Sequence, residues 1–363
     1  MKPHRWLSGV IAPLVLLVAA SLGFGPLRAT TQTPSVSRQA ALDNIAQRVL
    51  LPGYLDLAGK SRAFAAAANG LAAAPNPASL KRAQQAWRDT QVAWRQTRAF
   101  THGPLTDLGV SGRIQFWPAR PQSVERVLTA SRPLNQTYIE ELGANAVGLS
   151  ALEVLLFDAG GDDAGRLAAF SGAAGARRRE YLLALAADLA RNTQLVASRW
   201  QGPAGYAAKF ASGGQQQLNV LYNDLRAALD LGVKAPLQTV IDRQLEAQFP
   251  FEQVEGSLSG VSQQSVLAVL VGVRRAFSGG DAVGIDDYLA QLSPQNAARV
   301  DDQFKKTIAA VQALGGPIER AIGPREPALR LANDECHRLE MLLKVEVAST
   351  LGVTLTFKST DGD

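Results

Sequence analysis

Apolar residues recur at intervals of three and four positions along most of the chain. Leu80, Trp87 and Trp94, for example, follow one another on a single helical stripe. This spacing is typical of amphipathic helices that pack against one another, whereas the alternation expected of half-buried strands is nearly absent. The pattern therefore predicts an all-α fold built from helical bundles.

Capping residues and glycine or proline breaks set the expected helix boundaries. Ser37 and Ser79 are the expected N-caps of the first two long helices, and Gly352 is expected to end the last one. The helices are predicted over residues 37–74 with an interruption at Pro52-Gly53, 79 to the break at His102-Gly103-Pro104, 123–130, 134–158, 173–200, 213–231, 236–248, 261–277, 285–292, 295–314 and 327–351. Two segments depart from helix: an extended loop near 107–121 and a short C-terminal strand over 353–357.

The N-terminal stretch has the layout of a secretory signal peptide. Lys2 and Arg5 precede an apolar run, Leu14–Ala20, and small residues lead up to Ala29. We therefore predict a signal peptide over 1–29 and an exported protein; an uncleaved membrane anchor is the alternative. A lipid anchor would need a cysteine just after the apolar run, but the chain's single cysteine is Cys336.

The remaining chain is predicted to form two helical domains, 30–172 and 173–363. A stretch rich in Gly, Asp and Ala, 160–175, suggests the boundary. Loss of the three basic residues of the signal segment reduces the formal net charge from +5 to +2, too little to indicate nucleic acid as a partner. The apolar stretch 261–277 is interrupted by glycine and arginine, so it predicts a buried helix rather than a membrane span. Cys336 is read as a packed small residue, with a reactive thiol as the alternative.

The most informative local pattern surrounds Glu153. Leu149, Leu156 and Phe157 lie four positions before and three and four after it, so the carboxylate is expected on the buried face of its helix. Burial of an ionised carboxylate is costly, so Glu153 should have a cation, several donors or a raised pKa. Ser150 precedes it by one turn. Either both residues face a cleft as ligand-binding groups, or the glutamate is satisfied by an arginine between helices.

These residues also carry a family resemblance. Gly148-x-Ser150-x-x-Glu153 resembles the Gly-x-His-x-x-Glu signature of the imelysin family, in a variant with serine in place of histidine. Further segments, in the right order, resemble a predicted periplasmic branch of that family: Trp87 and Trp94 leading to Gly103-Pro104, Gly112 to Pro118, and the ending Leu351 to Phe357 followed by Asp361-Gly362-Asp363.

The resemblance implies an exported bacterial protein with two helical bundles and a site where they meet. Some members of the family are described as metallopeptidases, and others are tied to iron uptake. The signature's histidine and glutamate are the proposed metal ligands, which transfers a metal-ligand role to Glu153 and puts Ser150 where the imidazole should be. A neutral hydroxyl is a poor ligand for zinc or ferrous iron, so this departure argues against metal binding and peptidase activity here.

Four further residues are candidates for the same cleft: Asp107, Arg113, Trp117 and His102. An arginine on a loop suits an anionic ligand or a carboxylate partner, and an aromatic side chain suits a planar ligand. The alternative is an Arg113–Glu153 pair that locks the bundles, with Trp117 filling the core. His102 either shapes the turn at Gly103-Pro104 or reaches the cleft.

The sequence thus favours a periplasmic imelysin-like binding protein, linked to iron uptake and lacking peptidase activity, with a small ligand or a periplasmic protein as partner. The cofactor stays open, a divalent metal being the candidate. One alternative is a metallopeptidase that combines Glu153 with His102 or His337, although His337 shares with Glu340 a helix face that is expected to be solvated. The second alternative is a structural component in which Glu153 only fixes helix register.

Overall fold

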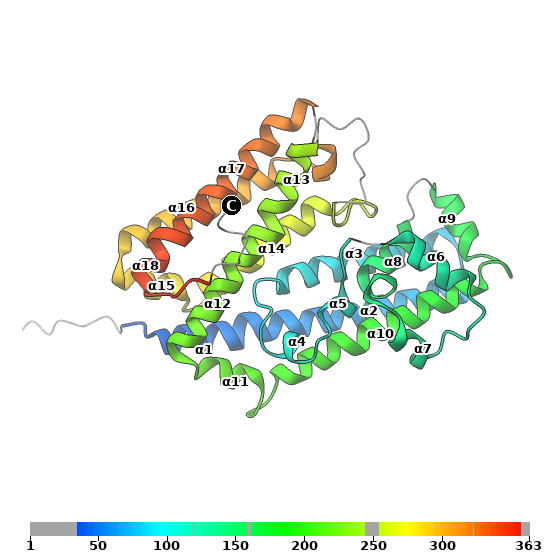
Figure 1. Ribbon diagram of the computed structural model, residues 1–363, viewed down its shortest axis with the longest axis horizontal. Coiled ribbons are helices and arrows are strands. Elements are labelled where there is room, and N and C mark those ends of the chain that lie inside the picture. The colour runs from blue at the N-terminus through cyan, green and yellow to red at the C-terminus, as the bar shows by residue number, and fades with distance from the viewer. Residues whose placement is uncertain (1–34, 119, 158–160, 244–253, 322, 357–363) are drawn as a thin grey trace, which may run out of the picture. The chain divides into compact units, whose positions relative to one another are not determined.

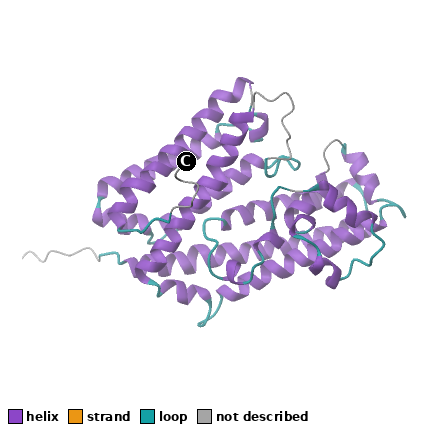
Figure 2. Ribbon diagram, in the orientation of Figure 1, coloured by secondary structure: helices purple, strands orange, loops and turns teal. Residues whose placement is uncertain are grey.

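Helices make up all the regular secondary structure in the part of the chain that the computed structural model describes, residues 35–118, 120–157, 161–243, 254–321 and 323–356 (Figure 2). The helices are α1 (Arg38–Ile45), α2 (Leu51–Ala73), α3 (Pro77–Thr97), α4 (Pro104–Asp107), α5 (Ser111–Ile114), α6 (Pro121–Thr129), α7 (Gln136–Glu141), α8 (Gly148–Phe157), α9 (Asp163–Phe170), α10 (Ala176–Trp200), α11 (Tyr206–Ala211), α12 (Gly214–Leu229), α13 (Ala235–Arg243), α14 (Ser262–Ser278), α15 (Ile285–Leu292), α16 (Pro294–Gln312), α17 (Glu326–Leu342) and α18 (Ala348–Leu351). The all-α prediction is confirmed.

Helix α3 is the element around which the candidate site is built. It packs against α2 on one side and α14 on another, and it also contacts α8. The long helices α2 and α10 lie side by side (Figure 1), and α16 pairs with α17 farther along the chain. Because α10 follows the predicted boundary at 172/173 and packs against α2 and α8, helices from both predicted halves share one bundle. The division into 30–172 and 173–363 remains a prediction.

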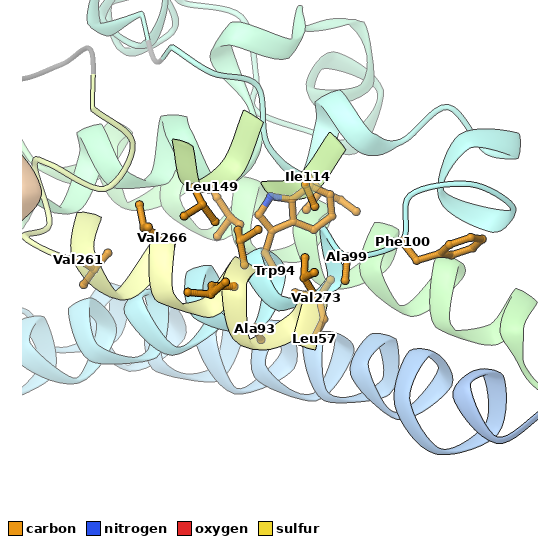
Figure 3. Packing of buried hydrophobic residues seen from close by; sticks show 14 of the residues in the cluster. Leu57, Ala93, Trp94, Ala99, Phe100, Ile114, Leu149, Val261, Val266 and Val273 are labelled. Carbon is orange, nitrogen blue, oxygen red and sulfur yellow. The ribbon is translucent and has the colours of Figure 1, made fainter. Parts of the chain in front are cut away.

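The core predictions for the two tryptophans of α3 are confirmed. Trp87 and Trp94 are buried, as is Cys336 on α17. Trp94 lies in one apolar cluster with Ile114 and Val273, which brings α5 and α14 onto α3 (Figure 3). The indole Nε1 of Trp87 donates to the backbone oxygen of Leu149 at 3.1 Å, so a core side chain also fixes the start of α8.

Helix boundaries differ from the predicted ones where local hydrogen bonding decides them. Ser79 is not the N-cap of α3: Asn76 is, and the two side chains form a reciprocal capping box. The predicted interruption at Pro52 is a π-helical turn, Ala46–Leu50, after which the proline sits in the first turn of α2, where no N–H is required. The predicted helix 134–158 is broken into α7, a 3-10 turn (Ala144–Ala146) and α8. Residues 244–248 of predicted helix 236–248 lie outside the described residues.

Two predicted irregular segments were wrong in part. The extended loop near 107–121 contains helix α5 and begins at the end of α4. Residues 353–356 form no strand, because their backbone is bonded by asparagine side chains of α12 rather than by a second strand. Thr354 N donates to Asn219 Oδ1 at 3.3 Å, and Thr356 N donates to Asn223 Oδ1 at 2.9 Å. Phe357 lies outside the described residues.

The predicted signal peptide, residues 1–29, also lies outside the described residues. Among the helices that are described, none combines the length and the apolar character needed to cross a bilayer. The expectation of a buried helix at 261–277 agrees with α14, whose inward face includes Val266, Val269 and Val273.

Candidate functional site

The glycine of the Gly-x-Ser-x-x-Glu motif allows a close approach of two backbones. Gly148 begins α8 with a φ of +70°, a conformation that residues with a Cβ rarely adopt. A Cβ at this position would lie 2.3 Å from the backbone oxygen of Arg113 and 2.5 Å from that of Ile114. The motif glycine therefore places α8 directly against α5.

Glu153, one and a half turns into α8, is fully buried, as the sequence predicted. Its Oε1 accepts hydrogen bonds from Ser259 N at 3.0 Å and from Ser259 Oγ at 2.7 Å. Its Oε2 has no hydrogen-bond partner among the described residues. Burial raises the pKa of the Glu153 carboxyl from its ordinary 4.5 to about 7, although the two bonds from Ser259 oppose the shift.

Ser150 lies one turn before Glu153 and is also buried. Its Oγ has no hydrogen-bond partner within the described chain. Buried polar atoms without partners are uncommon in proteins and call for a specific explanation. The motif thus presents two such oxygens, one on a carboxyl and one on a hydroxyl, on neighbouring turns of one helix.

Ser259 is the residue that sequence reasoning missed. It belongs to the turn before α14, within the run Glu255-Gly-Ser-Leu-Ser-Gly260. The small glycine and serine residues of this run are the sequence feature that could have pointed to Ser259. Ser259 also accepts, through its backbone oxygen, a bond from Arg88 Nε at 3.1 Å. Since Arg88 is on α3 and Glu153 on α8, Ser259 connects the motif helix, the central helix and the second predicted half of the chain.

A second buried carboxyl, Glu319, has a similar arrangement close to the same segment. Ser262, the first residue of α14, donates its hydroxyl to Glu319 Oε2 and accepts a bond from Ile318 N at 3.0 Å. Burial raises the pKa of Glu319 as well. The charges of Glu255 and Glu319 each add a smaller upward contribution to the pKa of Glu153.

A cavity of about 470 Å³ lies beside the Glu153–Ser259 pair. Phe157, one turn after Glu153, and Leu258, next to Ser259, form part of its wall. Arg88 lines it too and packs its guanidinium 4.8 Å from the centre of the Phe157 ring. The rest of the lining is polar, with two basic side chains, two amides and one acid: Lys81, Arg166, Gln84, Gln85 and Asp163. The cavity wall thus contains sequence neighbours of Glu153 and Ser259, although neither of these two residues lines it.

Comparison with known proteins shows the family to which this chain belongs. Residues 50–343 match the family model described as imelysin, which covers most of the chain. The chain belongs to the imelysin family. It is 26% identical over 301 residues to "Iron-regulated protein A" of Synechococcus elongatus, a match that covers 79% of each protein.

Two solved structures have the same fold as this imelysin-family chain. One is an imelysin-like protein from Psychrobacter arcticum, with a TM-score of 0.69 and 20% identity, covering 88% of this chain and 96% of that one. The other is described as a putative iron-regulated protein A precursor from Parabacteroides distasonis, with a TM-score of 0.73 and 21% identity, covering 88% and 97%.

Arg113 does not pair with Glu153 in this imelysin fold, so the predicted lock between the two was wrong. Its Nη2 bonds to Asp188 Oδ2 on α10 and to the backbone oxygen of Ile139, each at 3.0 Å. Asp188 is buried and attracts the guanidinium away from the motif. Arg113 contributes its backbone to the site, through the contact with Gly148, rather than its charge.

The other predicted site residues show no bond to the motif. Asp107, at the end of α4, is exposed, and Trp117 is partly buried in the segment after α5. His102 bonds through Nδ1 to Asp224 Oδ1 on α12 at 2.7 Å, and that hydrogen bond raises the pKa of the imidazole. His337 is largely exposed beside Glu340, which agrees with the solvated face expected for it.

The donor set does not fit the zinc or iron centre that the family signature implies. Such centres take three or four imidazole, thiolate or carboxylate ligands. Among the residues that the structure describes, no group of three or more His, Cys, Asp or Glu side chains is placed to hold a metal ion. At the motif itself, Glu153 is accompanied by the Ser150 hydroxyl, which is a weak ligand. We therefore derive no catalytic step through a metal.

Proposed function

We propose that this chain is an exported, periplasmic imelysin-family binding protein that holds a small polar ligand at Glu153 and Ser150 and does not cleave peptides. The observation that carries the proposal is a pair of buried oxygens that have no hydrogen-bond partner among the described residues, Glu153 Oε2 and Ser150 Oγ. A ligand with N–H or O–H donors would satisfy both oxygens at once. Ser259 holds the other carboxylate oxygen and so presents Oε2 in a fixed orientation.

The neighbouring cavity would give the ligand access to the motif and would hold the part of the ligand that does not contact Glu153. Arg166 is paired with Asp163, but Lys81 and Arg88 in the same lining favour a ligand whose remaining part carries acceptor or anionic groups. The wall residue Leu258 is next to Ser259, so a small shift of this turn would connect the cavity to the carboxyl. The ligand class is therefore a small molecule with donors at one end and acceptors at the other.

The link to iron acquisition rests on relatives rather than on geometry. A curated relative and a solved relative both carry the name iron-regulated protein A. Together with the signal-like N-terminus, this supports a role in the periplasmic response to iron supply. Cells grown with limited iron should then contain more of the protein in the periplasmic fraction, measured by immunoblot.

A second candidate function is structural, and one observation favours it. The bonds from Ser259 to Glu153 join segments that are far apart in the sequence and are wholly buried. A buried polar contact of this kind can fix the register between packed helices without binding anything. Glu153 would then matter to stability alone.

Ligand retention by paired variants separates these functions. Protein recovered from the periplasm is analysed by native mass spectrometry and metal analysis, as wild type, Glu153→Gln and Glu319→Gln. Glu319 is the matched control because it is also buried and also bonded to a serine. Binding at the motif predicts a co-purifying mass that Glu153→Gln loses and Glu319→Gln keeps. If neither variant changes ligand retention, the structural function holds.

Peptidase activity is tested on the same samples. Incubation with a fluorogenic peptide library, with and without a chelator, should give no cleavage above the level of buffer. Cleavage that the chelator abolishes and that Glu153→Gln lacks would overturn the proposal in favour of a metallopeptidase.

A further inference from the structure

A second cavity, of about 330 Å³, lies at the other end of α3 from the motif contacts. It is lined on one side by Arg95, Arg98 and His102 and on the other by α12 and the turn after it. This volume is at the small end of the range for sites that take metabolites. The cavity shares no lining residue with the one beside Glu153.

The acids around the second cavity are bonded to groups other than Arg98. Arg95 Nη1 is paired with Glu255 Oε2 at 2.6 Å. The Asp224 carboxylate is taken up by the His102 imidazole and by the backbone N–H groups of Thr101 and His102, at 2.7 and 3.2 Å. Each of these acids therefore has bonding partners other than Arg98 among the described residues.

Among the described residues, Arg98 is held in place by an aromatic ring rather than by a direct ion pair. Its guanidinium carbon lies 5.4 Å from the centre of the Trp94 ring, one turn earlier on α3. No hydrogen bond or ion pair reaches this guanidinium from the described residues. Stacking on an indole orients the guanidinium plane and leaves its N–H groups available for a planar anion. Burial, and next the charge of Arg95, lower the pKa of Arg98, and the smaller effects of Tyr54, Glu255 and Asp224 oppose this shift.

An independent observation on Arg95 points the same way. Arg95 is 7% exposed, and its Nε is buried with no hydrogen-bond partner within the described chain. A buried N–H donor of a charged group is costly to leave unsatisfied. Arg95, which lines the cavity together with Arg98, thus also carries a donor without a partner among the described residues.

We infer that this cavity is a second binding site, for a small organic anion whose carboxylate or phosphate is held by Arg98 with support from Arg95. Ala227, Ala228 and Leu231 form the apolar part of the wall and would contact the body of the ligand. The site does not involve Glu153 or Ser150, so it stands whether or not the motif binds a ligand.

Isothermal titration of the full mature chain tests the site with four probes. Inorganic phosphate and glycerol 3-phosphate represent phosphate ligands, and acetate and succinate represent carboxylates. The wild type should bind at least one probe saturably. Within each pair, the larger anion (glycerol 3-phosphate or succinate) should bind more tightly, because its carbon chain contacts the apolar wall.

Variants locate the binding. Arg98→Met removes the charge and keeps an apolar stem, and should weaken binding roughly ten- to hundredfold, the usual loss of a charged hydrogen-bonded pair. Arg82→Met is the matched control: it makes the same charge change on an exposed position of the same helix and should bind as the wild type does. Ala227→Leu narrows the cavity without touching either arginine and should also abolish binding.

Two results would overturn the inference. One is the absence of binding by the wild type to all four probes up to millimolar concentration. The other is equal loss of affinity in Arg98→Met and Arg82→Met, which would mean that net charge rather than this cavity attracts the anion. Thermal unfolding of each variant without probe shows that it is folded; if Arg98→Met is not, Ala227→Leu decides the test.

Discussion

Glu153 Oε1 accepts a hydrogen bond of 2.7 Å from Ser259 Oγ, across 106 positions of the sequence and in the absence of solvent exposure. The motif carboxyl is therefore fixed by a serine from the second half of the chain rather than by the arginine considered from the sequence. Its chemistry follows from burial, with two donors on one oxygen and, among the described residues, none on the other.

The first prediction concerns the pH dependence of stability. The folded carboxyl of Glu153 keeps its proton up to about pH 7, whereas the unfolded one loses it near its ordinary pKa of 4.5. Between these values the unfolded chain binds fewer protons, so the free energy of unfolding falls as pH rises through this range. A shift of this size corresponds to a loss of roughly 3 kcal/mol, complete above about pH 7.

Glu153→Gln should remove this loss, because the amide is neutral at every pH and can still accept from Ser259. Urea unfolding at pH 5 and pH 8 should show the variant close to the wild type at pH 5 and more stable than it at pH 8. Glu125→Gln, at an exposed position on α6, should change neither value by more than about 0.5 kcal/mol. A variant less stable than the wild type at pH 8 would mean that the fold stabilises the ionised carboxylate, which contradicts a raised pKa.

The second prediction contrasts two buried serines. Ser150 Oγ has no described partner, whereas the Ser262 hydroxyl donates to Glu319 and accepts from Ile318 N. Ser150→Ala should leave the free energy of unfolding unchanged or raise it by up to about 1 kcal/mol, and Ser262→Ala should lower it by about 1–3 kcal/mol. Ligand retention should show the reverse order: Ser150→Ala should lose the co-purifying mass, and Ser262→Ala should keep it. Equal destabilisation by both variants would show that Ser150 has a structural partner.

The sequence was sufficient for those parts of the fold that depend on local periodicity. The buried faces of α3 and α14, the burial of Glu153 and that of Cys336 follow from spacing and side-chain chemistry, and all are confirmed. The capping box of Asn76 and Ser79 was within reach as well. It was missed because either residue is a good N-cap, and the choice between them depends on the position of the backbone.

What could not be predicted are partners that are distant in sequence. Nothing near Arg113 indicates that it bonds to Asp188, and nothing near Glu153 indicates Ser259, because these pairs exist only once α10 and the turn before α14 are packed in place. The strand prediction for the C-terminal segment was wrong for the same reason. Its β-forming residues need an extended partner, and Asn219 and Asn223 of α12 meet its backbone instead.

The third prediction concerns the His102–Asp224 pair. The hydrogen bond from Asp224 raises the pKa of His102 above its ordinary 6.5. The stability gained from the pair is therefore present in full below the unfolded pKa and is lost as pH rises through the higher, folded value. Asp224→Asn should lower the pKa of His102, measured from its imidazole resonances by NMR. The resonances of His337, which lies beside Glu340, should not respond to the substitution. An unchanged His102 titration would show that the pair does not persist in solution.

The last prediction separates backbone strain from steric conflict at the motif glycine. Gly148 and Gly109 have similar positive φ angles, +70° and +64°, so alanine at either position has to adopt the same unfavourable conformation, at a cost of about 1–2 kcal/mol. Around Gly109 the space is open, but a Cβ at Gly148 would lie 2.3 Å from the backbone oxygen of Arg113. Backbone cannot move aside as a flexible side chain can, so α8 would have to shift away from α5.

Gly148→Ala should thus lower the free energy of unfolding by at least about 2 kcal/mol more than Gly109→Ala does, measured by urea unfolding. Because the shift also moves Glu153 relative to Ser259, Gly148→Ala should lose ligand retention while Gly109→Ala keeps it. Equal destabilisation by the two variants would mean that α8 and α5 are not in contact at this glycine, and the site would have to be rebuilt from a different packing of the motif helix.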